Sequence, residues 1–94
     1  MRVLWTARAE DDLLEIWRMI ARDNPGAADR MLDGIDASAR RLSVHPMIGR
    51  GRSELGVGVR SLVHGNYLIV YRPGEGVVEV LRCVHGKRDL RKLL

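Results

Sequence analysis

The stretch "VRSLVHGNYLIVYRPGEGVVEVLRCV", residues 59–84, contains three strand signals in succession. Each of the segments "VRSLV", "NYLIVYR" and "VVEVLRCV" is rich in β-branched or aromatic residues, which favour strands. They are separated by His64-Gly65-Asn66 and by Pro73-Gly74-Glu75-Gly76, and both separators suit hairpin turns. The second half of the chain therefore predicts an antiparallel run of strands.

Two amphipathic helices are predicted upstream of these strands. "RVLWT" (residues 2–6) is typical of a short strand, and Thr6 can cap the helix that follows. In residues 7–23, apolar side chains recur at the spacing of one helix face: Leu13, Ile16, Trp17 and Ile20. Residues 26–42 repeat this period after Asn24-Pro25-Gly26, where the first helix must stop because the residue before a proline avoids the helical region. The tight connection predicts an antiparallel helix hairpin.

The remaining segments complete an α+β fold. Residues 43–56 form a basic, glycine-containing loop, and loops of this length are often functional or mobile. "KRDLRKLL" (residues 87–94) predicts a short terminal helix or tail. Gly34 either weakens the second helix by about 1 kcal/mol relative to alanine or permits a neighbour to approach closely. We predict one domain over residues 1–94, in the order β-α-α-β-β-β, with the helix hairpin packed on an antiparallel sheet.

The predicted strands are apolar on both faces. Alternation along "YLIVY" puts Leu68 and Val70 on one face, and Tyr67, Ile69 and Tyr71 on the other. Along "VVEVLRCV", alternation puts Val78, Val80 and Val84 on one face with Arg82, and Val77, Leu81 and Cys83 on the other with Glu79. A half-exposed antiparallel strand is polar on one side, and the hairpin can cover only one face. We therefore expect a partly apolar surface that needs a partner, unless the terminal helix covers it.

Composition and charge restrict the classes of protein to which this chain can belong. The 94 residues are 46% hydrophobic and 30% charged, with no apolar run long enough for a membrane span, and the single Cys83 excludes an internal disulfide. These features favour a cytoplasmic location. The net charge of +4 is uneven, because residues 1–36 carry eight acidic and five basic side chains while residues 37–94 carry four and eleven. The basic half suits either nucleic acid or an acidic protein.

Candidate chemistry is sparse. His45, His64, His85 and Cys83 lack close-paired ligand spacing, so neither a metal site nor a cofactor is expected. Arg82 interrupts a valine face, where an unpaired charge is costly, so it needs a carboxylate partner or a functional task. A metal-free ribonuclease remains conceivable, with arginines that stabilise phosphate charge and a histidine for proton transfer. Its candidate residues are Arg82, His85 and Arg88.

Four strings in order resemble a known family: "ARAEDDLLEIW", "HPMIGRGRSEL", "VRSLVHGNYLIVYR" and "VLRCVHGKRDL". They are similar to the ParE branch of the RelE/ParE superfamily of toxins from type II toxin–antitoxin systems, over nearly the whole chain. The resemblance implies one of two activities. RelE-like members cut mRNA on the ribosome with basic residues and a terminal tyrosine, whereas ParE members poison DNA gyrase and have no catalytic residues.

The sequence departs from the RelE pattern. Arg88 stands where RelE has one of its arginines, but Leu68 replaces another, and the chain ends in leucines without the tyrosine. Leucine can neither stabilise phosphate charge nor move a proton. We therefore favour a non-enzymatic gyrase poison; a RelE-like nuclease and an inactive antitoxin-binding module are the alternatives.

The resemblance also implies partners and contact residues. We expect a cognate antitoxin, of the ribbon-helix-helix type with a segment that wraps the toxin, in a toxin–antitoxin hetero-oligomer. Direct nucleic-acid binding is not expected except through the target complex. Candidates for the gyrase-binding surface are Arg60, Arg82, His85, Lys87 and Arg88. Candidates for antitoxin binding are Trp17, Ile20, Leu68, Val70, Val80, Leu90 and Leu93.

Overall fold

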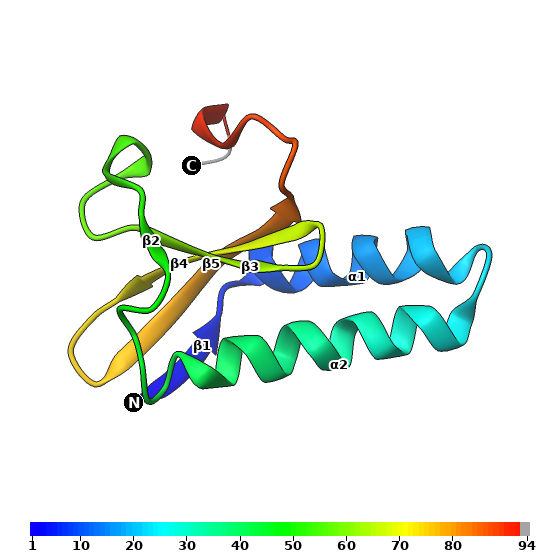
Figure 1. The fold of residues 1–94 in the computed structure, drawn as a ribbon, viewed down its shortest axis with the longest axis horizontal. Coiled ribbons are helices and arrows are strands. Elements are labelled where there is room, and N and C mark those ends of the chain that lie inside the picture. The colour runs from blue at the N-terminus through cyan, green and yellow to red at the C-terminus, as the bar shows by residue number, and fades with distance from the viewer. Residues whose placement is uncertain (93–94) are drawn as a thin grey trace.

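A helix hairpin lies against one face of a five-stranded sheet in the computed structural model, which describes residues 1–92 (Figure 1). The elements in chain order are β1 (Arg2–Trp5), α1 (Ala7–Ala21), α2 (Pro25–Arg41), β2 (Arg50–Gly51), the 3-10 helix η1 (Ser53–Leu55), β3 (Arg60–His64), β4 (Tyr67–Pro73), β5 (Val77–His85) and the 3-10 helix η2 (Leu90–Lys92). The strand order across the sheet is β1-β5-β4-β3-β2. No helix in this part of the chain combines the length and apolar character needed to cross a membrane.

The α+β class, the helix hairpin and the run of antiparallel strands are confirmed. The sheet itself is mixed, which corrects the expected all-antiparallel arrangement. β1 pairs in parallel with β5, from Arg2 opposite Val77 to Trp5 opposite Val80. The loop at residues 43–56 also holds more structure than expected, because β2 and η1 lie within it.

Local capping chemistry sets the boundaries of the two helices. Thr6 caps α1 as predicted, since its Oγ1 accepts a hydrogen bond from the Ala9 backbone at 3.1 Å. Asn24 caps α2 by accepting from the Ala27 backbone at 3.0 Å. Pro25 begins α2, a position where the missing N–H costs nothing. The Asn24-Pro25 pair therefore starts the second helix as well as ending the first.

A β-bulge in β5 changes which of its alternate residues face the helices. Tyr71 pairs with Val80 while the adjacent Val70 pairs with Arg82, so Leu81 is an extra residue without a partner in β4. Val78, Val80 and Cys83 consequently belong to the core under the helices, whereas Val84 belongs to a second apolar cluster on the other face. The expected alternation was wrong beyond Val80 because sequence alternation does not reveal a bulge.

The second face of the sheet is not left open as expected. Its buried cluster consists of Val59, Leu68, Val70, Val84 and Leu90, with Leu55 and Leu81 packed against it. Leu55 comes from η1 and Leu90 from η2, and these two segments lie together at the top of Figure 1. The terminal segment therefore covers this face, which was the alternative that the sequence allowed.

Gly34 allows the end of β3 to pack against α2. A Cβ atom at position 34 would lie 2.6 Å from Nε2 of His64, well inside contact distance. Nδ1 of the same histidine is hydrogen-bonded to Oγ of Ser38 at 2.8 Å. Of the two roles predicted for this glycine, the structure shows the close approach.

We predict that the effect of Gly34→Ala on stability depends on whether His64 is present. With His64 replaced by alanine, the new methyl group meets no imidazole and helix propensity should stabilise the protein by about 1 kcal/mol. With His64 present, the ring must shift and the Ser38 hydrogen bond weakens, which should cancel or reverse that gain. Urea unfolding of the four variants measures the coupling, and strictly additive effects would contradict the close approach.

Candidate functional site

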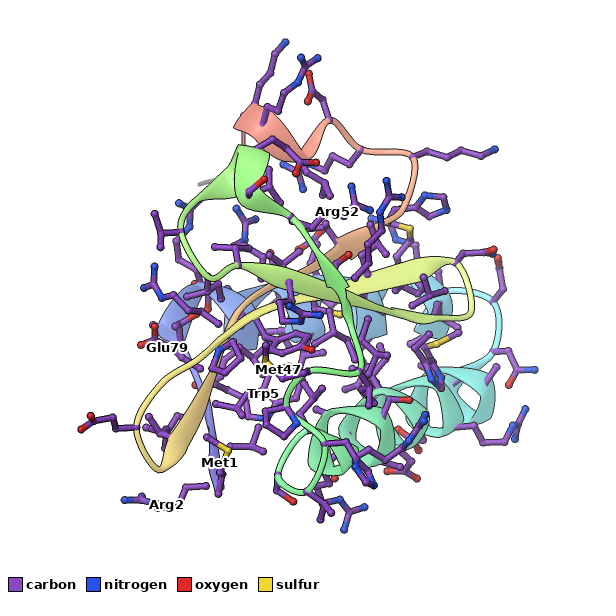
Figure 2. The ribbon with its side chains drawn as sticks, turned by 60° about the vertical axis from the view of Figure 1, so that its left-hand side comes forward. Met1, Arg2, Trp5, Met47, Arg52 and Glu79 are labelled. Carbon is purple, nitrogen blue, oxygen red and sulfur yellow. The ribbon has the colours of Figure 1, made fainter. Side chains whose placement is uncertain are left out.

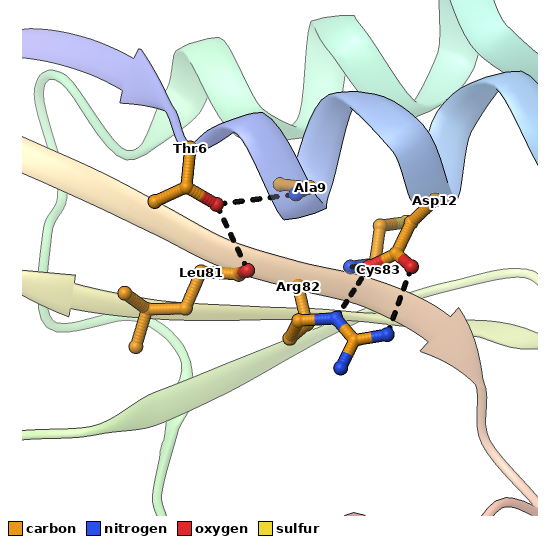
Figure 3. A network of polar contacts seen from close by, with 6 residues as sticks. All are labelled: Thr6, Ala9, Asp12, Leu81, Arg82 and Cys83. Carbon is orange, nitrogen blue, oxygen red and sulfur yellow. Dashed lines mark hydrogen bonds and ion pairs between the residues drawn. The ribbon is translucent and has the colours of Figure 1, made fainter. Parts of the chain in front are cut away.

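Helix α1 completes the hydrogen bonding of β5 where strand β1 ends. The β1–β5 pairing stops at Trp5 opposite Val80. Beyond it, Oγ1 of Thr6 donates to the Leu81 carbonyl at 3.0 Å, and Oδ2 of Asp12 accepts from the Cys83 backbone at 2.9 Å (Figure 3). The N-cap residue Thr6 and Asp12 of α1 thus take the place of a neighbouring strand along this part of the edge.

Arg82 is held by the same carboxylate. Its Nε and NH2 atoms donate to Oδ2 and Oδ1 of Asp12 at 2.8 and 2.9 Å, a bidentate pair, and the arginine is 5% exposed. The hydrogen bonds that Arg82 donates to Asp12 raise the pKa of Arg82, although burial acts in the opposite direction. The carboxylate partner that the sequence required is Asp12, and a target cannot reach this guanidinium unless the network opens.

Arg60 lies at the other end of the sheet from the terminal basic residues. Arg60 pairs with Tyr71 near one end of β3 and β4. At the other end of these strands His64 pairs with Tyr67, and Tyr67 pairs with His85. Nε and NH2 of Arg60 donate to the carbonyls of Gly49 and Met47 at 2.9 and 3.0 Å. The arginine therefore secures the loop before β2.

The remaining expected target residues are His85, at the end of β5, and Lys87 and Arg88, which follow it; all three are exposed. A shallow hollow of about 340 Å³ separates His85 and Lys87 from Arg52. Its other lining residues are Val63, Gly65, Asn66, Tyr67, Leu68 and Gly86. Arg88 lines an adjoining hollow, again with Arg52. The structure thus joins three of the five expected residues and adds Arg52, which sequence reasoning did not assign.

Arg52 is held in place by its neighbours. Its Nε donates to Oγ of the buried Ser61 at 2.9 Å, and its NH1 lies 3.6 Å from a carboxylate oxygen of Glu54. The glycine-flanked arginines of "GRGR" in a long basic loop were the available signal for this residue. The pairing with Ser61 depends on β2 and was not visible in the sequence.

An apolar groove lies between α1 and the end of β5. Its volume is about 140 Å³, and its walls are Ile16, Met19, Tyr67, Cys83 and Val84, with Asp12, Glu15, His85 and Arg88 around them. The ring of Tyr67 packs edge-on against that of His85, with centroids 5.7 Å apart. Met19 is 57% exposed, so the groove presents apolar surface to solvent.

The seven expected antitoxin residues are dispersed. Trp17 and Ile20 are half-buried on α1, where Nε1 of Trp17 donates to Oδ1 of Asp29 at 2.8 Å. Leu68, Val70, Val80 and Leu90 are buried in the two apolar clusters, and Leu93 lies outside the described residues. A partner can therefore reach Trp17 and Ile20 directly but needs a rearrangement to reach the four buried residues.

The site offers charge and hydrogen bonds but little reactive chemistry. Burial, reinforced by the charge of Asp12, raises the pKa of the Cys83 thiol to about 12, so the thiol stays protonated and inert. Among residues 1–92, no three His, Cys, Asp or Glu side chains gather closely enough to hold a metal ion. Such an arrangement suits binding of a charged partner.

Comparisons with known proteins find relatives over nearly the whole chain. A family model described as the ParE toxin of the type II toxin–antitoxin system parDE matches residues 3–90. Toxin ParE1 of Mycobacterium tuberculosis is 32% identical over 95 residues, covering 99% of this chain and 97% of that protein. Toxin ParE3 of Caulobacter vibrioides is 34% identical over 91 residues, covering 95% and 90%.

Solved structures share the fold. The chromosomal ParDE system from P. aeruginosa matches with a TM-score of 0.77 and 24% identity, over 90% of this chain and 95% of that one. The RelBE2 toxin–antitoxin complex from Mycobacterium tuberculosis has a TM-score of 0.66 and 28% identity, over 89% and 95%. A YoeB/ParE toxin from Agrobacterium tumefaciens has a TM-score of 0.63 and 27% identity, over 90% and 98%.

We predict that Asp12→Ala removes about 3–5 kcal/mol of stability, because it leaves Arg82 charged and buried without its carboxylate. Asp11→Ala, at an exposed neighbouring position, should change stability by less than about 0.5 kcal/mol. If the single variant fails to fold, the double variant Asp12→Ala/Arg82→Met should recover folding, since it removes the isolated charge. Equal urea midpoints for the Asp11 and Asp12 variants would contradict the proposed network.

Proposed function

The chain belongs to the family of ParE toxins of type II toxin–antitoxin systems, and from this we propose that it inhibits DNA gyrase by binding it. The toxin breaks no bond in this proposal; it stabilises a DNA-cleaved state of gyrase. A cognate antitoxin holds it inactive until release.

The main support for this proposal comes from the two strand positions that a nuclease would use, which hold a leucine and a paired arginine. Leu68, at the place of a RelE arginine, is a buried member of the second apolar cluster. Arg82 is neutralised by Asp12. Of the three candidate residues for a nuclease, Arg82, His85 and Arg88, only His85 and Arg88 are exposed. That set then retains a single guanidinium to stabilise a developing phosphorane, which favours binding over cleavage.

A RelE-like ribonuclease remains the competing function. Two observations favour it: the structural likeness extends to a RelBE2 toxin and to a YoeB/ParE toxin, and Arg52 lies across a hollow from His85. Arg52 supplies a cation close to Leu68, the position where RelE has an arginine. Activity assays must therefore include translating ribosomes.

The proposed antitoxin has a segment that docks in the apolar groove beside α1. An apolar side chain of that segment covers Met19 and Ile16, next to the half-buried Trp17 and Ile20. His85 and Arg88 border both this groove and the basic hollows. An antitoxin seated in the groove therefore overlaps the proposed target surface, which accounts for neutralisation by competition.

The proposed function predicts opposite results in two parallel assays. Purified toxin, freed from its antitoxin, is incubated with gyrase and plasmid and, separately, with translating ribosomes. We expect inhibited supercoiling or trapped cleaved DNA together with intact mRNA. Codon-positioned mRNA cuts with normal gyrase activity would establish the nuclease instead, and an effect in neither assay would favour an inactive binding module.

We predict that Met19→Glu weakens antitoxin binding by at least about tenfold, because it places a charge in the apolar groove next to Glu15. Leu14→Glu is the matched control, since Leu14 is similarly exposed at 48% on the same helix and does not line the groove. Titration calorimetry of both variants measures the difference. Equal affinities for the two variants would remove the groove from the antitoxin interface.

A further inference from the structure

We infer that the toxin contacts the DNA held by its target directly, through phosphate groups bound on the basic face. This face consists of Arg50, Arg52, Lys87 and Arg88. The last three line the hollows over β3, β4 and β5, and Arg50 is exposed on the edge strand β2. The inference deepens the proposed function and rests on it, because a gyrase complex supplies the DNA. It adds a nucleic-acid contact to a surface otherwise explained by protein binding.

Most cations of this face lack the ion pairs that neutralise their neighbours. Arg72 lies 3.4 Å from Glu79, and Arg91 lies 3.4 Å from Asp89. Within the part of the chain that the structure describes, Arg50, Lys87 and Arg88 form no such pair, and all three are exposed. Unpaired exposed cations on one face create a local positive field that an anionic partner can neutralise.

The strand register puts Arg50 of β2 on the face that carries the hollow. Arg50 lies opposite Ser61, and Ser61 lies opposite Val70, a member of the second apolar cluster. Residues opposite one another in antiparallel strands project to the same face. Arg52 is on this face too, since its Nε binds Oγ of Ser61, and Figure 2 shows it next to the C-terminal segment.

The hollow itself has the chemistry of a phosphate site. Donor groups line it: the guanidinium of Arg52, the ammonium of Lys87, the amide of Asn66 and the imidazole of His85. It contains no carboxylate. Val63, which is 66% exposed, adds an apolar side chain to the lining, and this suits a sugar. Because Ser61 already holds Arg52, little side-chain freedom is lost when the guanidinium binds a phosphate oxygen.

DNA fits this face better than an acidic protein segment does. A duplex carries one negative charge for about every 1.7 Å of its axis, so one occupant can meet several cations at once. The face spans the sheet from β2 to β5, three strand spacings or about 14 Å. A peptide would need acidic side chains spaced to match, whereas the backbone of DNA supplies phosphates continuously.

The test compares three binding partners over a series of salt concentrations: gyrase with bound duplex, gyrase alone, and the same fluorescently labelled duplex alone. The variant is Arg50→Glu/Lys87→Glu, which changes two exposed residues without ion pairs. The control is Arg22→Glu/Arg30→Glu, which makes the same charge change at exposed positions on the helix hairpin.

We expect the affinity of the wild-type toxin for gyrase with DNA to fall with salt at a logarithmic slope between about −3 and −4, as four phosphate contacts require. The Arg50/Lys87 variant should show a slope of about −2 and should lose more affinity for gyrase with DNA than for gyrase alone. The control variant should retain the wild-type slope.

Two results would overturn the inference. An equal loss of affinity for gyrase with and without DNA would assign the face to an acidic protein segment, and an unchanged variant would remove the face from the interface. If the toxin does not bind gyrase at all, the proposed function fails, and the duplex alone then decides the inference. Salt-dependent duplex binding that the variant weakens would sustain the phosphate site, and no duplex binding would end it.

Discussion

The hydrogen bonding of Asp12 to Arg82 and to the Cys83 backbone is the interaction on which the rest of the structure depends. One carboxylate closes the edge of β5 that β1 leaves open and neutralises a buried guanidinium. It also fixes α1 against the part of β5 that follows the bulge at Leu81. The groove beside α1 and the exit of the basic segment after His85 are both consequences of that docking.

Local features of the fold were predictable because they depend on residues close in sequence. The cap at Thr6, the helix hairpin around Pro25 and the turns between the strands follow from capping and turn chemistry. The parallel pairing of β1 with β5 and the bulge at Leu81 depend on residues far apart in the chain, and no periodicity reports them. The resemblance gave the family, but it did not indicate the bulge.

The features of the candidate site likewise divide into those that the sequence indicated and those that depend on the fold. The sequence indicated that Arg82 needed a partner, yet Asp12 lies 70 residues away and its role depends on the fold. The sequence also identified the basic segment around Lys87 and Arg88, which the structure leaves exposed. It could not reveal that Arg52 joins them, because that requires β2 to pair with β3. The apolar second face was recognised, and cover by the terminal segment was the stated alternative, but the contribution of η1 was not anticipated.

These contacts support the proposal that the protein acts by occupying a surface. The strand positions that could serve a nuclease are filled by the buried Leu68 and the neutralised Arg82, while the exposed cations surround open hollows. The groove beside α1 borders the same His85 and Arg88, so one region of the molecule serves both proposed partners. Competition for that region is then the simplest form of control.

The most direct test of action by binding is the stoichiometry of inhibition and its reversal. Gyrase at fixed concentration is titrated with toxin until supercoiling stops, and an equimolar amount of antitoxin is then added. Action by binding predicts that inhibition saturates near one toxin per binding site and that antitoxin restores supercoiling without new gyrase. Inhibition by far fewer toxin molecules than gyrase molecules, or damage that persists after antitoxin is added, would show a catalytic toxin and contradict it.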